Sequence, residues 1–313
     1  MKKIVRPIVV ATMLLGLVSQ QVYAIDTTAI NEKWGKPTVV YGGGLNDQQI
    51  KETSHLLGIK DENTVTTTKA TGEDLVKYLG AGEANTSVMI SSVMVQKRNK
   101  GEGVKVHIAT PKNITLVTSE QYANAAITAG VADAEIEVAS VSKVTGESAL
   151  TGVYKAFEAN GVVLDGKRTA VAQQELELTN QIAQEQAKEK GFDAAKLDQA
   201  MIDIKKSLAE IKEKQGQVAT KEDVERIVNE ALKKYGLDKV ISPTQVNNII
   251  QFALSYQQTS AIDSKQVLEQ LNSLSNTVKG KIGQLVDQAN REGWFDKIVT
   301  FFKEIFNSIF QSK

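Results

Sequence analysis

The sequence predicts a two-part protein: an α/β or α+β N-terminal domain with a mixed sheet and packed helices, followed by an all-α helical region. Residues 25–167 contain 15 glycines and 16 threonines, whereas residues 168–313 contain 6 and 7. Glycine and threonine favour turns and strands, so the first part should contain the sheet. The second part carries helix stop and start signals in regular succession. The chain has 313 residues, 42% of them hydrophobic, which is enough for packed cores in both parts.

The first predicted elements are a strand over residues 38–41 and a helix over residues 46–57. The strand is a β-branched run that stops at the three glycines of residues 42–44. Asn46 and Gln49 have the spacing of a capping box, in which each side chain binds the backbone N–H group of the other. These signals predict a strand, a tight turn and a helix in close succession.

The next two strands are predicted to form a β-hairpin. Residues 88–95 form one strand candidate, and residues 104–108 alternate between apolar and polar side chains. The polar loop of residues 97–103 separates them. These two strand patterns therefore predict a β-hairpin with a long polar loop.

Two further strand and helix pairs complete the predicted N-terminal domain. A short strand over residues 114–117 leads into a capping box at residues 118–121, and the helix that follows stops at Gly130. Residues 134–138 alternate as a strand, and residues 147–159 place apolar side chains on one helical face. This order of strands and helices predicts a mixed sheet with helices packed against it.

Residues 168–291 are predicted to form five or six amphipathic helices. Their stop and start signals include Gly191, Gly216, Gly236 and the dipeptide Ser242-Pro243. Each stretch has an apolar stripe and a charged face. We therefore expect the helices to pair as an antiparallel bundle or to lie across the sheet domain.

Residues 1–24 have the layout of a secretory signal peptide. Lys2, Lys3 and Arg6 precede an apolar run over residues 8–18, and Ala24 ends a small-x-Ala cleavage pattern. The apolar run is shorter than the ~20 residues that a membrane-spanning helix needs, so an uncleaved anchor is the weaker alternative. The sequence predicts a secreted, extracellular protein, with a peripheral position on the outer face of the cell membrane as a further alternative.

The composition excludes several kinds of chemistry. The chain has no cysteine and two histidines. This excludes disulfide bonds, thiolate metal sites, a cysteine nucleophile and a histidine-rich metal centre. Removing the three basic residues of the signal peptide from the 37 in the chain leaves 34, against 37 acidic residues. We therefore predict no cofactor, no metal and no nucleic-acid partner.

The turn of Gly42, Gly43 and Gly44, together with Asn46, is the candidate ligand-binding turn. Free backbone N–H groups at a helix start favour an anion such as a phosphate or a carboxylate. The turn has neither the Gly-Lys-Ser/Thr of a Walker loop nor the spaced glycines of a dinucleotide-binding turn. The alternative, which the sequence favours, is a tight strand-to-helix turn without a ligand.

A hydrolase site in this domain would need a nucleophile and a base. Ser148 follows Gly146 as in a Gly-x-Ser-x-Gly nucleophile elbow, but Leu150 replaces the closing glycine. Ser148 is therefore predicted to be an early helix residue. The candidate bases are His55 and His107, and both are predicted to lie on the surface.

Glu135 and Glu137 are predicted to lie on the same face of the sheet, because they are two residues apart in a strand. Paired carboxylates can act in acid–base catalysis or hold a cation, but two are too few for a calcium site. The sequence favours a solvated strand face. The basic residues 97–100 are predicted to be a solvated turn, with a weak phosphate contact as the alternative.

Residues 292–313 are predicted to form an amphipathic helix, and five of the eight phenylalanines of the chain lie in residues 294–310. The predicted aromatic face consists of Trp294, Phe295, Ile298, Phe301, Phe302, Ile305, Phe306, Ile309 and Phe310. Burial of one such aromatic is worth about 1.5–3 kcal/mol, so this face should be covered. The rest of the bundle is the favoured cover, and the membrane surface or an envelope partner are the alternatives.

Four blocks of the sequence resemble the YpuA-like family of predicted secreted Gram-positive proteins of unknown function. They are VVYGGGL at residues 39–45, TPKNIT at 110–115, QYANAAITAGV at 121–131 and VTGESALTGVYKA at 144–156. The resemblance spans about residues 30–240. It implies export but no activity, because the family offers no established catalytic or binding residues.

We therefore predict a secreted or cell-envelope-associated, non-catalytic binding or structural protein of unknown ligand. The membrane surface or an envelope partner would be reached through the C-terminal helix. The alternative is an extracellular hydrolase with a site in the N-terminal domain near the glycine turn. A pocket that unites the glycine turn with His107 or Ser148 would favour the enzyme, and their separation would favour the binding protein.

Overall fold

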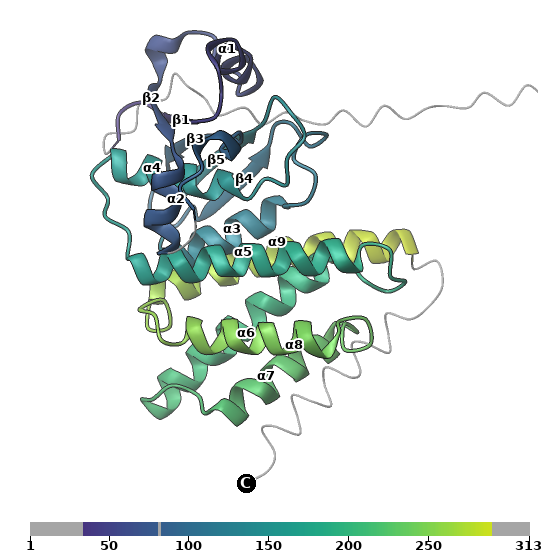
Figure 1. Ribbon diagram of the computed structural model, residues 1–313. Helices are drawn as coiled ribbons and strands as arrows, with labels where there is room; N and C mark the ends of the chain where they lie inside the picture. Colours follow the sequence, from purple (N-terminus) through teal and green to yellow (C-terminus); the bar gives the residue numbers. More distant parts are fainter. Residues whose placement is uncertain (1–33, 81–82, 290–313) are drawn as a thin grey trace, which may run out of the picture.

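The structure, a computed structural model, describes residues 34–80 and 83–289. The predicted signal peptide and the predicted aromatic helix of residues 292–313 lie outside the described residues. A sheet with helices on its two faces forms one part of the molecule, and further helices stack beneath it (Figure 1). The prediction of a mixed α/β part followed by a helical region is confirmed.

Five strands form one mixed sheet in the order β2-β1-β3-β5-β4. The β1–β2 and β4–β5 pairs are parallel, and β3 is antiparallel to both β1 and β5. The strands are β1 (Thr38–Gly42), β2 (Thr66–Ala70), β3 (Ser92–Lys97), β4 (Val104–Ile108) and β5 (Ala134–Ala139).

The predicted hairpin of β3 and β4 is wrong, because β5 lies between these two strands. The loop of residues 98–103 can bridge the gap, since even a few extended residues span two strand spacings of about 4.8 Å each. An interior position goes to β5, whose side chains are mostly buried. The edge position goes to β4, which carries the exposed Lys105, and a lysine is well tolerated at a sheet edge.

Three further local predictions differ from the structure. The β2 strand and helix α2 (Gly72–Leu79) were not predicted, because the threonine-rich strand has no apolar alternation. The strand candidate at residues 88–95 begins only at Ser92, and Val88 is 57% exposed at the end of a 3-10 turn. Residues 114–117 contribute one isolated bridge between Ile114 and Val144 in place of a strand.

Helices cover the two faces of the sheet. Val40, Val93 and Val138 face helices α3 (Ser119–Ala129) and α4 (Ser148–Ala159), whereas neighbouring strand residues face α1 (Asp47–Leu56). This division follows from the alternation of side chains along a strand. The predicted capping boxes at the starts of α1 and α3 are confirmed.

Five helices form the described C-terminal part, and the predicted glycine and Ser-Pro signals separate most of them. Helices α5 and α9 lie across the side of the sheet unit that carries α3, and α6, α7 and α8 form the layer beyond them (Figure 1). Among the described helices, none has the length and apolarity needed to cross a lipid bilayer. The bounds are α5 (Gly166–Gln186), α6 (Ala194–Gln215), α7 (Lys221–Lys234), α8 (Pro243–Tyr256) and α9 (Lys265–Ala289).

Candidate functional site

The glycine turn uses its backbone N–H groups inside the protein. Gly43 donates to the Ala70 carbonyl at 2.7 Å, and Gly44 donates to the Met89 carbonyl at 3.0 Å. A Cβ atom at Gly42 would lie 2.2 Å from the Met89 oxygen, so the neighbouring chain already fills the space beside the turn. Neither Gly43 nor Gly44 has a free N–H group to offer an anion.

Asn46 is also engaged within the chain. Its side chain accepts from the Gln49 N–H at 2.9 Å, and its own N–H donates to Gln49 Oε1 at 3.0 Å. The candidate turn at residues 42–46 is therefore built from satisfied donors. This geometry favours the interpretation as a tight strand-to-helix turn.

The adjacent strands β4 and β5 bring His107 and Glu137 together. The two residues are paired in register, and His107 Nδ1 lies 2.7 Å from Glu137 Oε2. Glu137 is 3% exposed, and this burial raises its pKa, while the hydrogen bond and the charge of His107 act in the opposite direction. The prediction of a solvated face is therefore wrong for Glu137. Its neighbour Glu135 forms an ion pair with Arg98.

The sheet separates His107 from Ser148. The β4 residues Val104, Val106 and Ile108 pack on the side of the sheet that carries α4, so His107 lies on the opposite side. Ser148 is the first residue of α4. The candidate nucleophile and the candidate base therefore cannot meet across the sheet.

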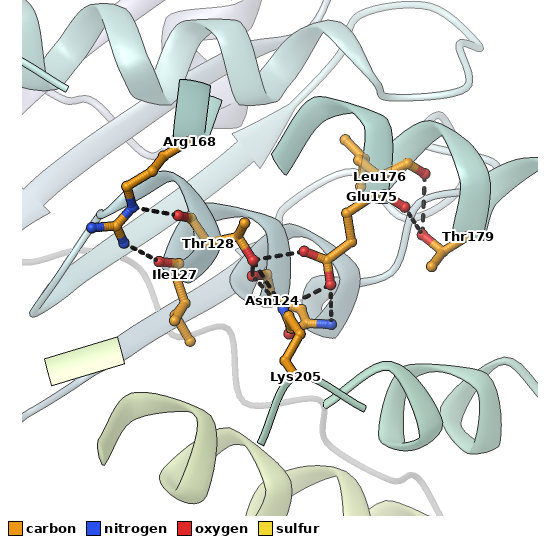
Figure 2. Close-up of polar contacts among 8 residues, drawn as sticks. All are labelled: Asn124, Ile127, Thr128, Arg168, Glu175, Leu176, Thr179 and Lys205. Carbon is orange, nitrogen blue, oxygen red and sulfur yellow. Dashed lines mark hydrogen bonds and ion pairs between the residues drawn. The ribbon is translucent and has the colours of Figure 1, made fainter. Parts of the chain in front are cut away.

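An ion pair that the sequence did not predict is buried where the helical part meets α3. Lys205 Nζ of α6 lies 2.7 Å from Glu175 Oε1 of α5, and the two side chains are 0% and 2% exposed. Lys205 also donates to Asn124 Oδ1 at 2.6 Å and to Thr128 Oγ1 at 2.9 Å (Figure 2). Burial lowers the pKa of Lys205, and the interaction with Glu175 opposes this shift.

Glu175 is satisfied by the same two residues of α3. It accepts from Asn124 Nδ2 at 2.8 Å and from Thr128 Oγ1 at 2.7 Å, so three helices meet in one connected polar network (Figure 2). Nearby, Arg168 donates to the Thr128 and Ile127 carbonyls at 2.8 and 3.2 Å and caps the end of α3. The network fixes α3, α5 and α6 relative to one another.

A second buried acid, Asp198 of α6, lies at the start of α3. Its Oδ2 accepts from Thr118 Oγ1 at 3.3 Å, and its Oδ1 has no hydrogen-bond partner among the described residues. Burial raises the pKa of Asp198 well above its ordinary value, and the nearby charge of Glu120 adds to this rise.

We expect the Asp198→Asn variant to become more stable relative to the wild type as pH rises. Above the unfolded pKa of about 3.9, the unfolded chain loses this proton while the folded protein retains it. The wild type therefore loses stability with rising pH until the raised folded pKa is passed, and Asn cannot ionise. Urea unfolding at about pH 4, 6 and 8 measures the difference.

The exposed Asp238→Asn is the matched control, and its effect on the free energy of unfolding should not follow this trend. A difference between Asp198→Asn and the wild type that stays constant with pH would contradict the assignment.

A cleft of about 500 Å³ lies where the β3–β4 loop meets the first turns of α9. The cleft could not be predicted from the sequence, because it depends on the insertion of β5 and on a helix more than a hundred residues further along the chain. Its walls include Lys100, Gly101, Gly103, Asp133, Lys265 and Glu269.

Asp133 holds the loop that lines this cleft. Its Oδ1 accepts from the N–H groups of Gly101 and Gly103 at 2.9 and 3.0 Å. Its φ of 48° lies in the left-handed region, which aspartate tolerates better than most residues. Gln270 of α9 accepts from the Asp133 N–H at 3.4 Å and donates to the Val131 carbonyl at 3.3 Å. The loop, the entry to β5 and α9 are thereby joined.

The described residues offer no assembled metal centre. Within residues 34–80 and 83–289, no three His, Asp or Glu side chains are grouped so that they could hold a metal. The candidate features are the His107 imidazole beside the Glu137 carboxylate, the separate Ser148 and the cleft. They lie in a mixed-sheet protein with a helical extension.

Comparison with known proteins assigns the chain to a family. The family model described as "Protein of unknown function (DUF1002)" matches residues 41–274. The uncharacterized protein YpuA of Bacillus subtilis (strain 168) is 30% identical over 281 residues, which cover 88% of this chain and 89% of that protein. The chain belongs to this family of unknown function, and the YpuA-like resemblance is confirmed. No solved structure matches the chain.

Proposed function

We propose that this protein is a secreted or cell-envelope-associated, non-catalytic binding or structural protein, and that its ligand occupies the cleft between the β3–β4 loop and α9. The cleft carries the proposal, because ligand sites are concave and largely preformed. The hydrogen bonds of Asp133 and Gln270 fix its walls. The opposite positions of His107 and Ser148 on the sheet favour binding over hydrolysis.

The alternative, an extracellular hydrolase, is favoured by one observation. Glu137 orients the imidazole of His107, an arrangement that suits a general base. Glu137 on β5 and His107 on β4 lie two and three strand positions from β1, whose end carries the glycine turn. Ser148 lies across the sheet from His107. Loss of a measured hydrolase activity in the His107→Ala variant would favour this alternative.

The proposed location is tested by fractionation of the native host into cytoplasm, membrane, wall and medium. The signal-peptide pattern of residues 1–24 supports export, and the aromatic pattern of residues 292–313 supports contact with the membrane surface or an envelope partner. We expect the full-length protein in the membrane or wall fraction. We expect the protein truncated after Arg291 in the medium.

The matched variants are Phe302→Ser with Phe306→Ser on the predicted aromatic face, and Lys303→Ser with Asn307→Ser on the predicted polar face. Only the aromatic pair should release the protein into the medium. Retention of the truncated protein in the envelope would refute the proposed role of residues 292–313. Recovery of the full-length protein in the cytoplasm would refute the proposed location.

A further inference from the structure

The outer edge of β4 carries unpaired backbone groups. On the inner edge, Ala109 donates to the Val138 carbonyl at 2.8 Å, and the Gly103 carbonyl accepts from Ala134 at 3.0 Å. Every second residue of a strand directs its N–H and C=O groups to the same neighbouring strand. The backbone groups of residues 104, 106 and 108 therefore point away from β5. None of these six groups has a hydrogen-bond partner within the described ranges.

Such a row of alternating N–H donors and C=O acceptors is complementary to the backbone of another extended polypeptide. Strand addition to a sheet edge satisfies both backbones, and polymers without peptide groups cannot reproduce the pattern. A strand of five residues spans about 17 Å at ~3.4 Å per residue, so the complementary segment is also about five residues long. The half-buried side chains of Val104, Val106 and Ile108 leave this edge partly accessible to solvent.

Lysines surround this edge. Lys100 precedes β4, Lys105 lies within it and Lys112 follows it, and all three side chains are exposed. None of them forms a salt bridge within the described part of the chain. Lys265 stands on the α9 side of the cleft.

The acidic groups nearby compensate this charge only in part. Glu135 and Glu137 are already paired with Arg98 and His107. Glu269 lines the cleft, and Glu102 accepts from the Asn99 N–H at 3.2 Å. Asp133 also lines the cleft and accepts only from backbone N–H groups. Four lysines therefore lie near three carboxylates that form no salt bridge within the described part of the chain. This surplus favours a negatively charged occupant.

We propose that the free edge of β4 binds an extended, acidic polypeptide segment by strand addition. The cleft begins at Gly101 and Gly103, directly before β4, so one end of the added segment enters it. There the segment lies between Lys100 and Lys265. This proposal rests on the proposed binding function and names the chemistry of its ligand.

The test uses the full-length protein and a fluorescent peptide of alternating Glu and Val, about seven residues long. The first control peptide has the same side chains but carries N-methyl groups on alternate peptide bonds, which removes one row of donors. The second control replaces each Glu by Lys. We expect the acidic peptide to bind and to slow hydrogen exchange at the amides of Val104, Val106 and Ile108. Both controls should bind at least about tenfold more weakly.

Two proline variants give a matched comparison. Proline is tolerated where the lost N–H group faces outward from a sheet edge. Val106→Pro removes an outward donor of β4, whereas Thr67→Pro removes an outward donor of β2 at the opposite edge. Val106→Pro should abolish peptide binding, and Thr67→Pro should leave it unchanged. Lys105→Glu should weaken binding at least about tenfold while the sheet remains intact.

Several results would overturn the proposal. The first is that the acidic peptide does not bind. The second is that its N-methylated form binds equally well, because charge alone would then explain the contact. The proposal would also fail if inorganic polyphosphate bound and slowed hydrogen exchange in β4 as much as the peptide does. These failures would not alter the fractionation result, whereas a cytoplasmic location would refute the proposed function without changing the peptide result.

Discussion

The Lys205→Met variant should lose about 3–5 kcal/mol of unfolding free energy, which makes it the most damaging of the substitutions considered. Lys205 and Glu175 are fully buried partners, so removal of the ammonium leaves a carboxylate without a counterion in a site that water does not reach. Asn124 and Thr128 lose a donor at the same time. Urea unfolding at neutral pH measures the loss.

The double variant Lys205→Met with Glu175→Gln distinguishes two causes of the lost stability, an unpaired buried charge and altered packing. The amide that replaces the Glu175 carboxylate would be neutral and would still offer an acceptor to Asn124, so the double variant should recover most of the lost stability. Replacing the half-buried neighbour Lys206 with Met should change the free energy of unfolding by less than about 1 kcal/mol. A double variant as unstable as the single one would show that the charge is not the cause.

Gly42→Ala should cause the second large loss, about 3 kcal/mol. The new Cβ would lie 2.2 Å from the Met89 oxygen and 2.9 Å from the Ile90 carbonyl carbon. Both contacts are with backbone, so no side-chain rotation relieves them, and the end of β1 must separate from the segment beside it. Thermal unfolding of the two proteins measures the effect.

Gly166→Ala is the matched control for the glycine turn. A Cβ at Gly166, the first residue of α5, would meet no atom within 4 Å, and alanine favours a helix by up to about 1 kcal/mol. This variant should be as stable as the wild type or slightly more stable. An unchanged melting temperature in Gly42→Ala would show that close packing does not explain the glycine.

The local parts of the fold could be predicted from the sequence, whereas the pairing of distant segments could not. The starts of α3 and α8 at Thr118 and Ser242 could be predicted, because a cap and the first turn of its helix lie within four residues. The insertion of β5 between β3 and β4 could not be predicted, because strand order depends on contacts across the whole domain.

The buried ion pair and the cleft could not be predicted for the same reason, since each is formed by segments that are far apart in the sequence. Lys205 gave one signal in the sequence, a lysine among the apolar residues Ile202, Ile204 and Leu208 of a predicted helix. Its partner Glu175 lies on another helix, so the ion pair could not be inferred from spacing. The cleft depends in the same way on Asp133 and on a distant face of α9.

Helix α3 belongs to two hydrophobic cores at once. Ala125 and Ala126 pack toward the sheet, while Ala123 and Ile127 pack among the C-terminal helices. Cleavage of the backbone between α4 and α5 would therefore not yield two autonomous folding units. The sheet fragment would expose one side of α3, and the helical fragment would lack part of its interior, so the protein should unfold in a single cooperative transition.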